Sequence, residues 1–198
     1  MKTNHIKTPN RSSKKSPCIL AASATWLLPA LVLILMIESS QADSATWVGS
    51  TDAGGDWNTP DNWTPATVPN GLGDTATFDT SLTTTVGFSA DTVVHGIVFN
   101  PGIESPGSAF TIGGSMTSAP TSLIISDGGI TNISGTTQNF VTFGGSFSFT
   151  LLFRDNATSG NNVTITNNGA DIFGELGGST RFYDGSTAGN LARSIASS

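Results

Sequence analysis

Two aspartates are the residues of this chain best spaced to do chemistry together. Asp155 and Asp184 hold the same position in the pattern F-x-D-x-x-T-x-G-N, which begins at Phe153 and again 29 residues later at Phe182. If that period is structural, the carboxylates stack one coil apart, at about 5 Å. Such a pair can carry acid–base work on a polysaccharide or bind Ca²⁺ through oxygen ligands. The hypothesis that we favour is simpler: each Asp caps a turn by accepting backbone N–H bonds.

Other catalytic groups are sparse. His95 is the only histidine after residue 42, so the sequence offers neither a histidine cluster for zinc nor a second general base. His95 lies in VVHGIVF, where we expect it on the outer face of a strand, and no nearby serine has a G-x-S-x-G context. The G-G-x-G-x-D nonapeptide of calcium-binding β-rolls is also absent. We therefore expect no enzyme activity, no cofactor and no bound metal.

Three tryptophans form a second candidate site. Trp47, Trp57 and Trp63 fall within 17 residues and are separated by glycine, asparagine and proline turns. Their rings could form a ligand-binding platform that stacks on a sugar. The turn context favours the alternative, an aromatic cluster that covers the open end of a stacked-coil protein, where core and sheet edge would otherwise be bare.

The repeated pattern indicates the architecture that positions these residues. A 29-residue period is typical of stacked coils, and a unit with one inward Phe must bury that face against its neighbour. From Asp43 onward, 79 of 156 residues are Thr, Ser, Gly or Asn and none is Lys. That composition suits pleated strands and turns and disfavours helices. We predict an all-β fold, a right-handed parallel β-helix or β-solenoid with a Trp-rich N-terminal cap.

Strands are predicted to be short and closely spaced. The candidates, each bounded by turn residues, are 75–78, 83–88, 92–99, 109–112, 122–126, 130–133, 140–143 and 146–153, with further alternation at 163–165. The clearest is 146–153. Phe147, Phe149, Leu151 and Phe153 lie at two-residue intervals, with Ser146, Ser148 and Thr150 on the other face, so all four are expected to point into the core.

Residues 1–42 have the order of an export signal. Five basic residues precede an uncharged run over 18–37, and Ser40-Gln41-Ala42 supplies small residues before a cleavage site. The run is also long enough for an uncleaved membrane anchor, although we favour cleavage. The remaining chain has three arginines and thirteen acidic residues, a net charge of −10. This acidic balance argues against nucleic acid or anionic lipid as a partner.

The chain resembles a known family over most of residues 45–190. The pattern W-x-G, G-G-x-W-x-x-x-x-N-W and V-P-x-x-x-D-x-A-x-F is similar to the opening of secreted bacterial proteins with autotransporter-associated β-strand repeats. It is carried by Trp47, Gly49, Gly54, Gly55, Trp57, Asn62, Trp63, Val68, Pro69, Asp74, Ala76 and Phe78. GIVFNPG and FTIGG, at Gly96 and Phe110, also resemble the family's repeats. Because members usually run to many repeats, the resemblance also implies a fragment of a longer protein.

We thus expect three parts: a signal peptide or anchor over 1–42, a Trp/Gly-rich cap over 43–78 and solenoid repeats over 79–198. The expected role is an exported structural or adhesive module at the bacterial cell surface, outside the cell or in the periplasm. Extracellular polysaccharide or other surface proteins are the expected partners, with membrane contact only through an uncleaved N-terminal segment. The alternatives are a carbohydrate-binding or polysaccharide-active β-helix, with Trp47, Trp57 and Trp63 as ligand-binding residues, and a piece of a longer repeat protein.

Overall fold

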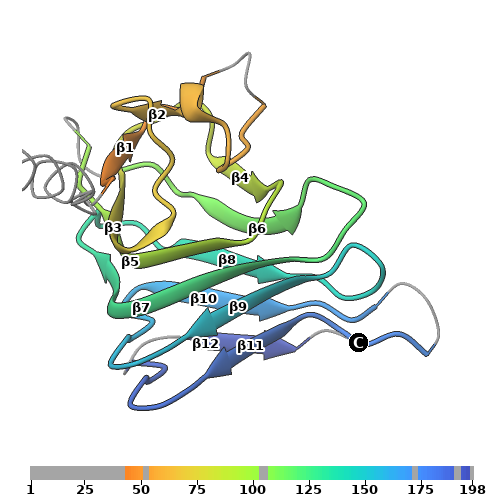
Figure 1. Cartoon of the computed structure of the whole chain (residues 1–198). Helices are drawn as coiled ribbons and strands as arrows, with labels where there is room; N and C mark the ends of the chain where they lie inside the picture. Colours follow the sequence, from red (N-terminus) through yellow and green to blue (C-terminus); the bar gives the residue numbers. More distant parts are fainter. Residues whose placement is uncertain (1–42, 51–53, 103–106, 171–173, 190–192, 197–198) are drawn as a thin grey trace, which may run out of the picture. The chain divides into compact units, whose positions relative to one another are not determined.

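The computed structural model describes residues 43–50, 54–102, 107–170, 174–189 and 193–196, so the predicted export signal lies outside the described part. Gln41–Ser198 forms one compact unit. Parallel strands stack there as a β-solenoid of about five turns (Figure 1). The predicted all-β fold class is confirmed. No helix within the described ranges is long and apolar enough to cross a membrane.

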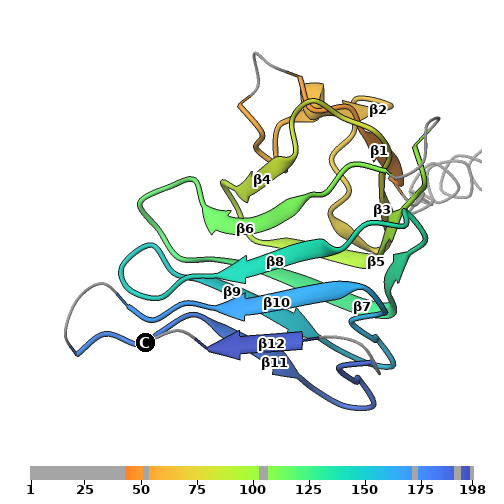
Figure 2. The same ribbon diagram turned by 180° about the vertical axis from the view of Figure 1, so that it is seen from behind.

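The coils build two sheets, seen from opposite sides in Figures 1 and 2. The seven-stranded sheet has, in order, β11 (Ser179–Phe182), β9 (Phe149–Phe153), β7 (Thr121–Asn132), β5 (Thr92–Phe99), β3 (Gly71–Phe78), β1 (Ala45–Trp47) and β2 (Trp63–Thr64). The five-stranded sheet has β12 (Arg193–Ala196), β10 (Val163–Asn167), β8 (Gln138–Thr142), β6 (Thr111–Ser115) and β4 (Thr85–Phe88). From β3 onward the chain alternates between the sheets, so each coil adds one strand to both.

Because the strands pair in register, side chains at equivalent positions of successive coils stack into columns. Ile125 of β7 pairs with Phe153 of β9, and Phe153 pairs with Phe182 of β11. Alternate residues of each strand face inward, and β9 is buried at its first, third and fifth positions. The core consists largely of these columns, in which Phe78 stacks on its register partner Phe99 at a centroid distance of 5.1 Å. Phe88 of β4 stacks on Phe149 of β9 across the core, between the two sheets, at 4.9 Å.

The strand that the sequence marked most clearly is shorter than predicted. β9 begins at Phe149, and Phe147 is 56% exposed instead of pointing into the core. The reason is a turn before the strand, where the Phe149 N–H donates to the Phe143 carbonyl oxygen at 2.9 Å. The prediction for Phe147 was therefore wrong, while Phe149, Leu151 and Phe153 are fully buried as expected.

The N-terminal end of the stack is built differently from the coils. After a short 3₁₀ turn, η2 (Pro60–Asn62), β2 runs antiparallel to β1, with Trp63 opposite Trp47. β2 has only two residues and is the last strand of its sheet. A strand this short offers few free backbone groups to another chain.

Candidate functional site

The three tryptophans form one buried cluster at the β2 end. Trp47, Trp57 and Trp63 are 1%, 0% and 2% exposed, and Trp63 makes edge contacts with the other two rings. Every indole N–H is bonded internally: Trp47 to the Thr83 carbonyl at 2.9 Å, Trp57 to the Pro69 carbonyl at 3.0 Å, and Trp63 to the Trp57 carbonyl at 2.6 Å. Stacking on a sugar needs a free ring face, and none is open here. The burial of all three rings therefore favours the cap over the sugar platform.

Polar side chains fasten this cap to the first full coil. The Asp56 carboxylate accepts bonds from the Ser89 N–H at 3.0 Å and the Ser89 hydroxyl at 2.8 Å. The Asn58 side chain accepts from the Ala90 N–H at 3.0 Å and donates to the Thr92 hydroxyl at 2.9 Å. Because these bonds reach residues more than 30 positions away, they hold the cap in one place on the turn between β4 and β5.

The 29-residue repeat is structural. Thr158 pairs with Thr187 in a parallel bridge, just as Phe153 pairs with Phe182. The Thr187 N–H donates to the Ala157 carbonyl at 2.9 Å, which ties the same parts of two successive coils. The prediction that the two copies of the motif stack one coil apart is confirmed.

The two motif aspartates lie in tight turns, as expected, but their carboxylates do not cap these turns. Both have a left-handed backbone, with φ of 58° at Asp155 and 56° at Asp184. Asp tolerates this region better than most residues. The turn around Asp155 is closed by backbone groups, with the Ala157 N–H donating to the Arg154 carbonyl at 3.0 Å. In the described part of the chain neither carboxylate accepts a hydrogen bond from a backbone N–H. The prediction that each aspartate caps its turn was therefore wrong.

A third aspartate belongs to the same row. Asp127 lies two residues after Ile125, just as Asp155 lies two residues after its register partner Phe153. Sequence reasoning missed it because the coil begins with Ile instead of Phe, although ISDGG at 125–129 parallels FYDGS at 182–186. Asp127, Asp155 and Asp184, which we call the aspartate row, are all exposed. Among the described residues, no three acidic, histidine or cysteine side chains converge as a metal site would require.

An open groove of about 420 Å³ runs beside the aspartate row. Aliphatic side chains, of which Val93 and Ile124 are half-buried and Leu72 is exposed, line it together with the motif turns: Leu72, Val93, Ile124, Arg154, Asp155, Tyr183 and Asp184. Tyr183 is 41% exposed and thus offers the free aromatic surface that the tryptophans lack. The groove combines apolar, aromatic and charged groups on the outer face of the seven-stranded sheet.

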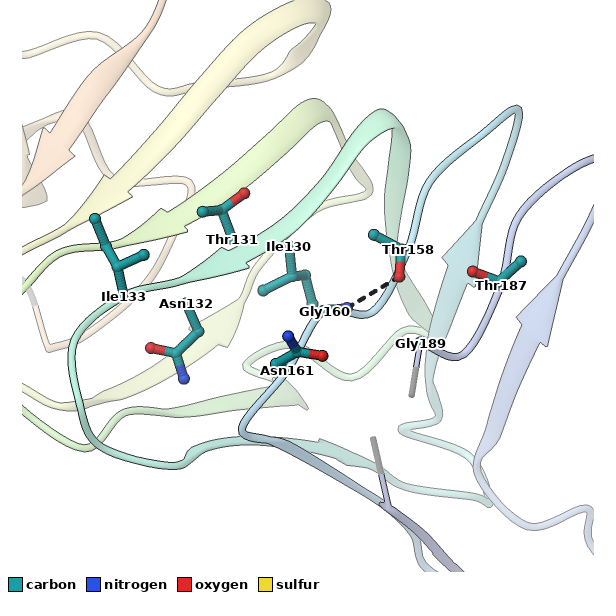
Figure 3. Close-up of a pocket in the computed structure, with 9 residues that line it drawn as sticks. All are labelled: Ile130, Thr131, Asn132, Ile133, Thr158, Gly160, Asn161, Thr187 and Gly189. Atoms are coloured by element: carbon teal, nitrogen blue, oxygen red, sulfur yellow. Dashed lines mark hydrogen bonds between the residues drawn. The ribbon is translucent and has the colours of Figure 1, made fainter. Parts of the chain in front are cut away.

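A second groove, of about 470 Å³, is lined by the other motif positions (Figure 3). Its lining comprises Ile130, Thr131, Asn132, Ile133, Thr158, Gly160, Asn161, Thr187 and Gly189. We call it the Thr/Asn groove. Both motif copies contribute a threonine and a glycine, so equivalent groups recur one coil apart. The lining presents hydroxyl, amide and backbone groups and holds no titratable side chain, so it is suited to hydrogen bonding and not to proton transfer.

Neighbouring bonds hold the Thr/Asn groove in shape. The Asn132 amide donates to the Thr136 carbonyl and to the Asn162 carbonyl, both at 2.9 Å. The Gly160 N–H donates to the Thr158 hydroxyl at 3.3 Å, the bond drawn in Figure 3. Asn161 is exposed at the rim. A groove braced by its own hydrogen bonds loses little entropy when a ligand enters.

His95 takes no part in either groove lining. It is half-buried on β5, between the buried residues Val94 and Gly96, which places its side chain on the outer face as predicted. Its ring lies against Gly128 of the next coil, where an added Cβ would come within 2.8 Å of it. His95 therefore packs against a neighbouring strand.

Comparison with protein-family models, with curated proteins and with solved structures gave no match. The fold of the chain is a β-solenoid repeat module.

Proposed function

We propose that this chain is an exported adhesive module of a bacterial surface protein, and that its Thr/Asn groove holds an extracellular polysaccharide. The observation that carries the proposal is the repetition of the groove. Thr158 and Gly160 recur as Thr187 and Gly189 one coil further along. A ligand that meets the same groups at a fixed spacing is best matched by a polymer that itself repeats.

The chemistry of the lining supports a neutral, hydroxyl-rich ligand. Threonine hydroxyls and the Asn161 amide both donate and accept hydrogen bonds, as sugar hydroxyls do. The acidic balance after residue 42 disfavours polyanions such as nucleic acid. The basic-then-apolar order of residues 1–42 supports export, and the resemblance to proteins with autotransporter-associated repeats supports a place at the bacterial surface.

A polysaccharide-active β-helix is the second candidate, favoured by one observation. Asp155 and Asp184 stand exposed one coil apart beside a groove that also presents Tyr183. Two carboxylates at a short separation can act as acid and nucleophile on a glycosidic bond. An Asp155→Asn, Asp184→Asn double variant separates the candidates, because it abolishes glycan cleavage if the aspartates act and leaves adhesion through the Thr/Asn groove unchanged.

Binding of the exported protein to a panel of bacterial and host polysaccharides tests the main proposal. The Asn161→Ala variant removes an exposed amide at the groove rim and should weaken binding roughly two- to tenfold, the worth of one hydrogen bond. Asn156→Ala is the matched control, because Asn156 is equally exposed on the same coil but lines neither groove. Equal loss in both variants, or no polysaccharide binding by the unaltered protein, would refute the proposal.

A further inference from the structure

Asp74 of β3 is a buried carboxylate beside the Trp cap. It is 6% exposed and lies at the bulge of β3. Its Oδ1 atom accepts the Asp43 N–H at 2.8 Å, and its Oδ2 atom accepts the Asn70 N–H at 2.9 Å. Both donors are neutral amides, and within the described ranges no arginine or histidine forms an ion pair with Asp74. A carboxylate that is removed from water is costly to bury unless a cation pairs with it.

Strand pairing holds the Asp43 nitrogen next to this carboxylate. β1 lies parallel beside β3, with Ala45 opposite Ala76 (Figure 1). The Ser44 hydroxyl accepts a backbone N–H of β3 at 2.9 Å, which continues the pairing one residue before β1. The same register one residue earlier sets Asp43 beside Asp74. The position of this nitrogen therefore follows from the sheet itself.

Cleavage of the export signal after Ala42 would change the charge of the same nitrogen. Water hydrolyses the peptide bond between Ala42 and Asp43, which leaves a carboxylate on Ala42 and an amino group on Asp43. An α-amino group is mostly protonated at neutral pH. The neutral N–H that now faces Asp74 at 2.8 Å then becomes an ammonium group. Hydrogen bonds between two charged groups are roughly twice as strong as those between neutral groups.

We propose that Asp74 is the binding site for the amino terminus that cleavage after Ala42 creates, and that this ion pair completes the Trp cap. The proposal rests on the export part of the proposed function and adds what processing does to the fold. Asp74 also holds Asn70, whose side-chain oxygen accepts the Val93 N–H of β5 at 2.9 Å. The new terminus is thereby connected to the first two coils. The uncleaved chain has only the amide bond at Asp43, so its cap is the less stable one.

The reactivity of the new amine tests the ion pair, because no lysine follows residue 42 and the cleaved protein has one primary amine. Sulfosuccinimidyl acetate adds one acetyl group to it, which intact mass detects after hydroxylamine has removed any acetyl groups from hydroxyls. Only the neutral amine reacts, and an ion pair favours the ammonium. The exported protein should therefore react at least tenfold more slowly than its Asp74→Asn variant. Asp91→Asn is the matched control, because Asp91 likewise accepts a backbone N–H of another coil, that of Ser122 at 2.8 Å, and its variant should react as slowly as the unaltered protein.

Thermal unfolding of the acetylated proteins separates the charge from the hydrogen bond. Acetylated Asp43 keeps an N–H that can donate to Asp74 but carries no positive charge. Complete acetylation should lower the melting temperature of the unaltered exported protein by about 2–6 °C, the difference between a charged and a neutral donor. Asp91→Asn should lose as much on acetylation. Asp74→Asn should lose nothing, because its side chain has no charge for the ammonium to pair with.

Three results would each overturn the proposal: exported protein that begins at a residue other than Asp43, equal acetylation rates with and without the Asp74 carboxylate, or an unchanged melting temperature after acetylation of the unaltered protein. The last comparison needs no substitution, so it decides the question even if Asp74→Asn does not fold. None of these measurements involves a polysaccharide. A protected amine in a protein that binds no polysaccharide would refute the adhesive role and support the Asp74 site, and the opposite result would refute only the site.

Discussion

Phe153 and Phe182 stack face to face, with ring centroids 4.8 Å apart and ring planes 7° apart, although 29 residues separate them in the chain. The spacing equals that of adjacent strands, so one repeat of the motif equals one coil of the solenoid. The other motif positions follow from this contact. Once the two rings are in register, the aspartates, threonines and glycines of the two copies stand in rows on the outside.

The turn before β9 predicts unequal effects of two phenylalanine truncations. Phe149→Ala should lower the free energy of unfolding by about 3–5 kcal/mol, because it opens a cavity beside Phe88 in the core. Phe147→Ala should change it by no more than about 0.5 kcal/mol, because that ring is exposed. Denaturant titrations of both variants measure the difference. Equal losses would mean that the strand begins earlier than Phe149.

Two glycines with similar backbone angles allow the cost of a left-handed backbone to be distinguished from the cost of a steric clash between coils. Gly54 and Gly160 have φ of 67° and 74°, but only a Cβ at Gly160 would overlap the Ile130 carbonyl oxygen. Gly54→Ala should cost about 1–2 kcal/mol, the penalty of a left-handed backbone. Gly160→Ala should cost clearly more, because the preceding coil, which carries Ile130, must also move away. Thermal unfolding of the two variants checks this, and similar shifts in melting temperature would contradict the close approach of the coils.

Gln138 is a buried polar bridge between coils. Its side-chain oxygen accepts from the Phe110 N–H at 2.7 Å, while its amide donates to the Ser108 carbonyl and the Ser134 hydroxyl at 3.0 Å. Gln138→Leu should destabilise the fold by about 1–3 kcal/mol, because it leaves the Phe110 N–H without a partner. Gln138→Glu retains that acceptor but turns a carboxylate oxygen toward the Ser108 carbonyl. It should therefore be less stable at pH 8 than at pH 4, whereas the loss in Gln138→Leu should not depend on pH.

Fluorescence quenching tests the cap. In a Trp26→Phe background only the three cap tryptophans emit, and all three are buried. Acrylamide should quench the native protein several times less than the same protein in denaturant. Strong quenching of the native state would mean that at least one indole has an open face, and it would restore the sugar-platform hypothesis.

The mass of the exported protein tests the predicted cleavage of the export signal. If Ser40-Gln41-Ala42 precedes the cleavage site, protein recovered outside the cytoplasm should begin at Asp43. Intact-mass analysis reads this directly. Recovery of the full-length chain in the membrane fraction would identify residues 1–42 as an anchor.

The fold could be predicted from sequence because its signals are local or periodic. The alternation at 149–153 and the repeated Phe153 and Phe182 are visible without a structure, and both hold. The limits of strands were harder to place. Predicted strands 122–126 and 130–133 form the single strand β7, because the glycines between them continue its pairing with β5 through a register shift.

The candidate site was less predictable, because it depends on contacts between distant residues. Asp155 and Asp184 were found from their pattern, but the polar lining at Asn161 and Thr187 was not recognised as a groove. The burial of Gln138 could not be predicted either, because nothing in the neighbouring sequence, which is rich in threonine and asparagine, indicates that this glutamine lies in the core. The tryptophans were ambiguous for the same reason: only the packing around each indole decides whether its ring is open.

The difference between the two ends of the solenoid sets an order in which the protein comes apart. Within the described residues, β3 and β5 to β10 each pair with a strand on both sides, and β4 pairs with β6 and is bridged to the cap between Gly87 and Asp56. In the same residues β11 and β12 each pair with one strand only. In a stack where each unit contacts only the next, opening begins where one set of contacts is missing and proceeds unit by unit. Amide protons of the last coil should thus exchange with solvent first and those beside Trp57 last, so that the protein peels from its C-terminal coil toward its cap.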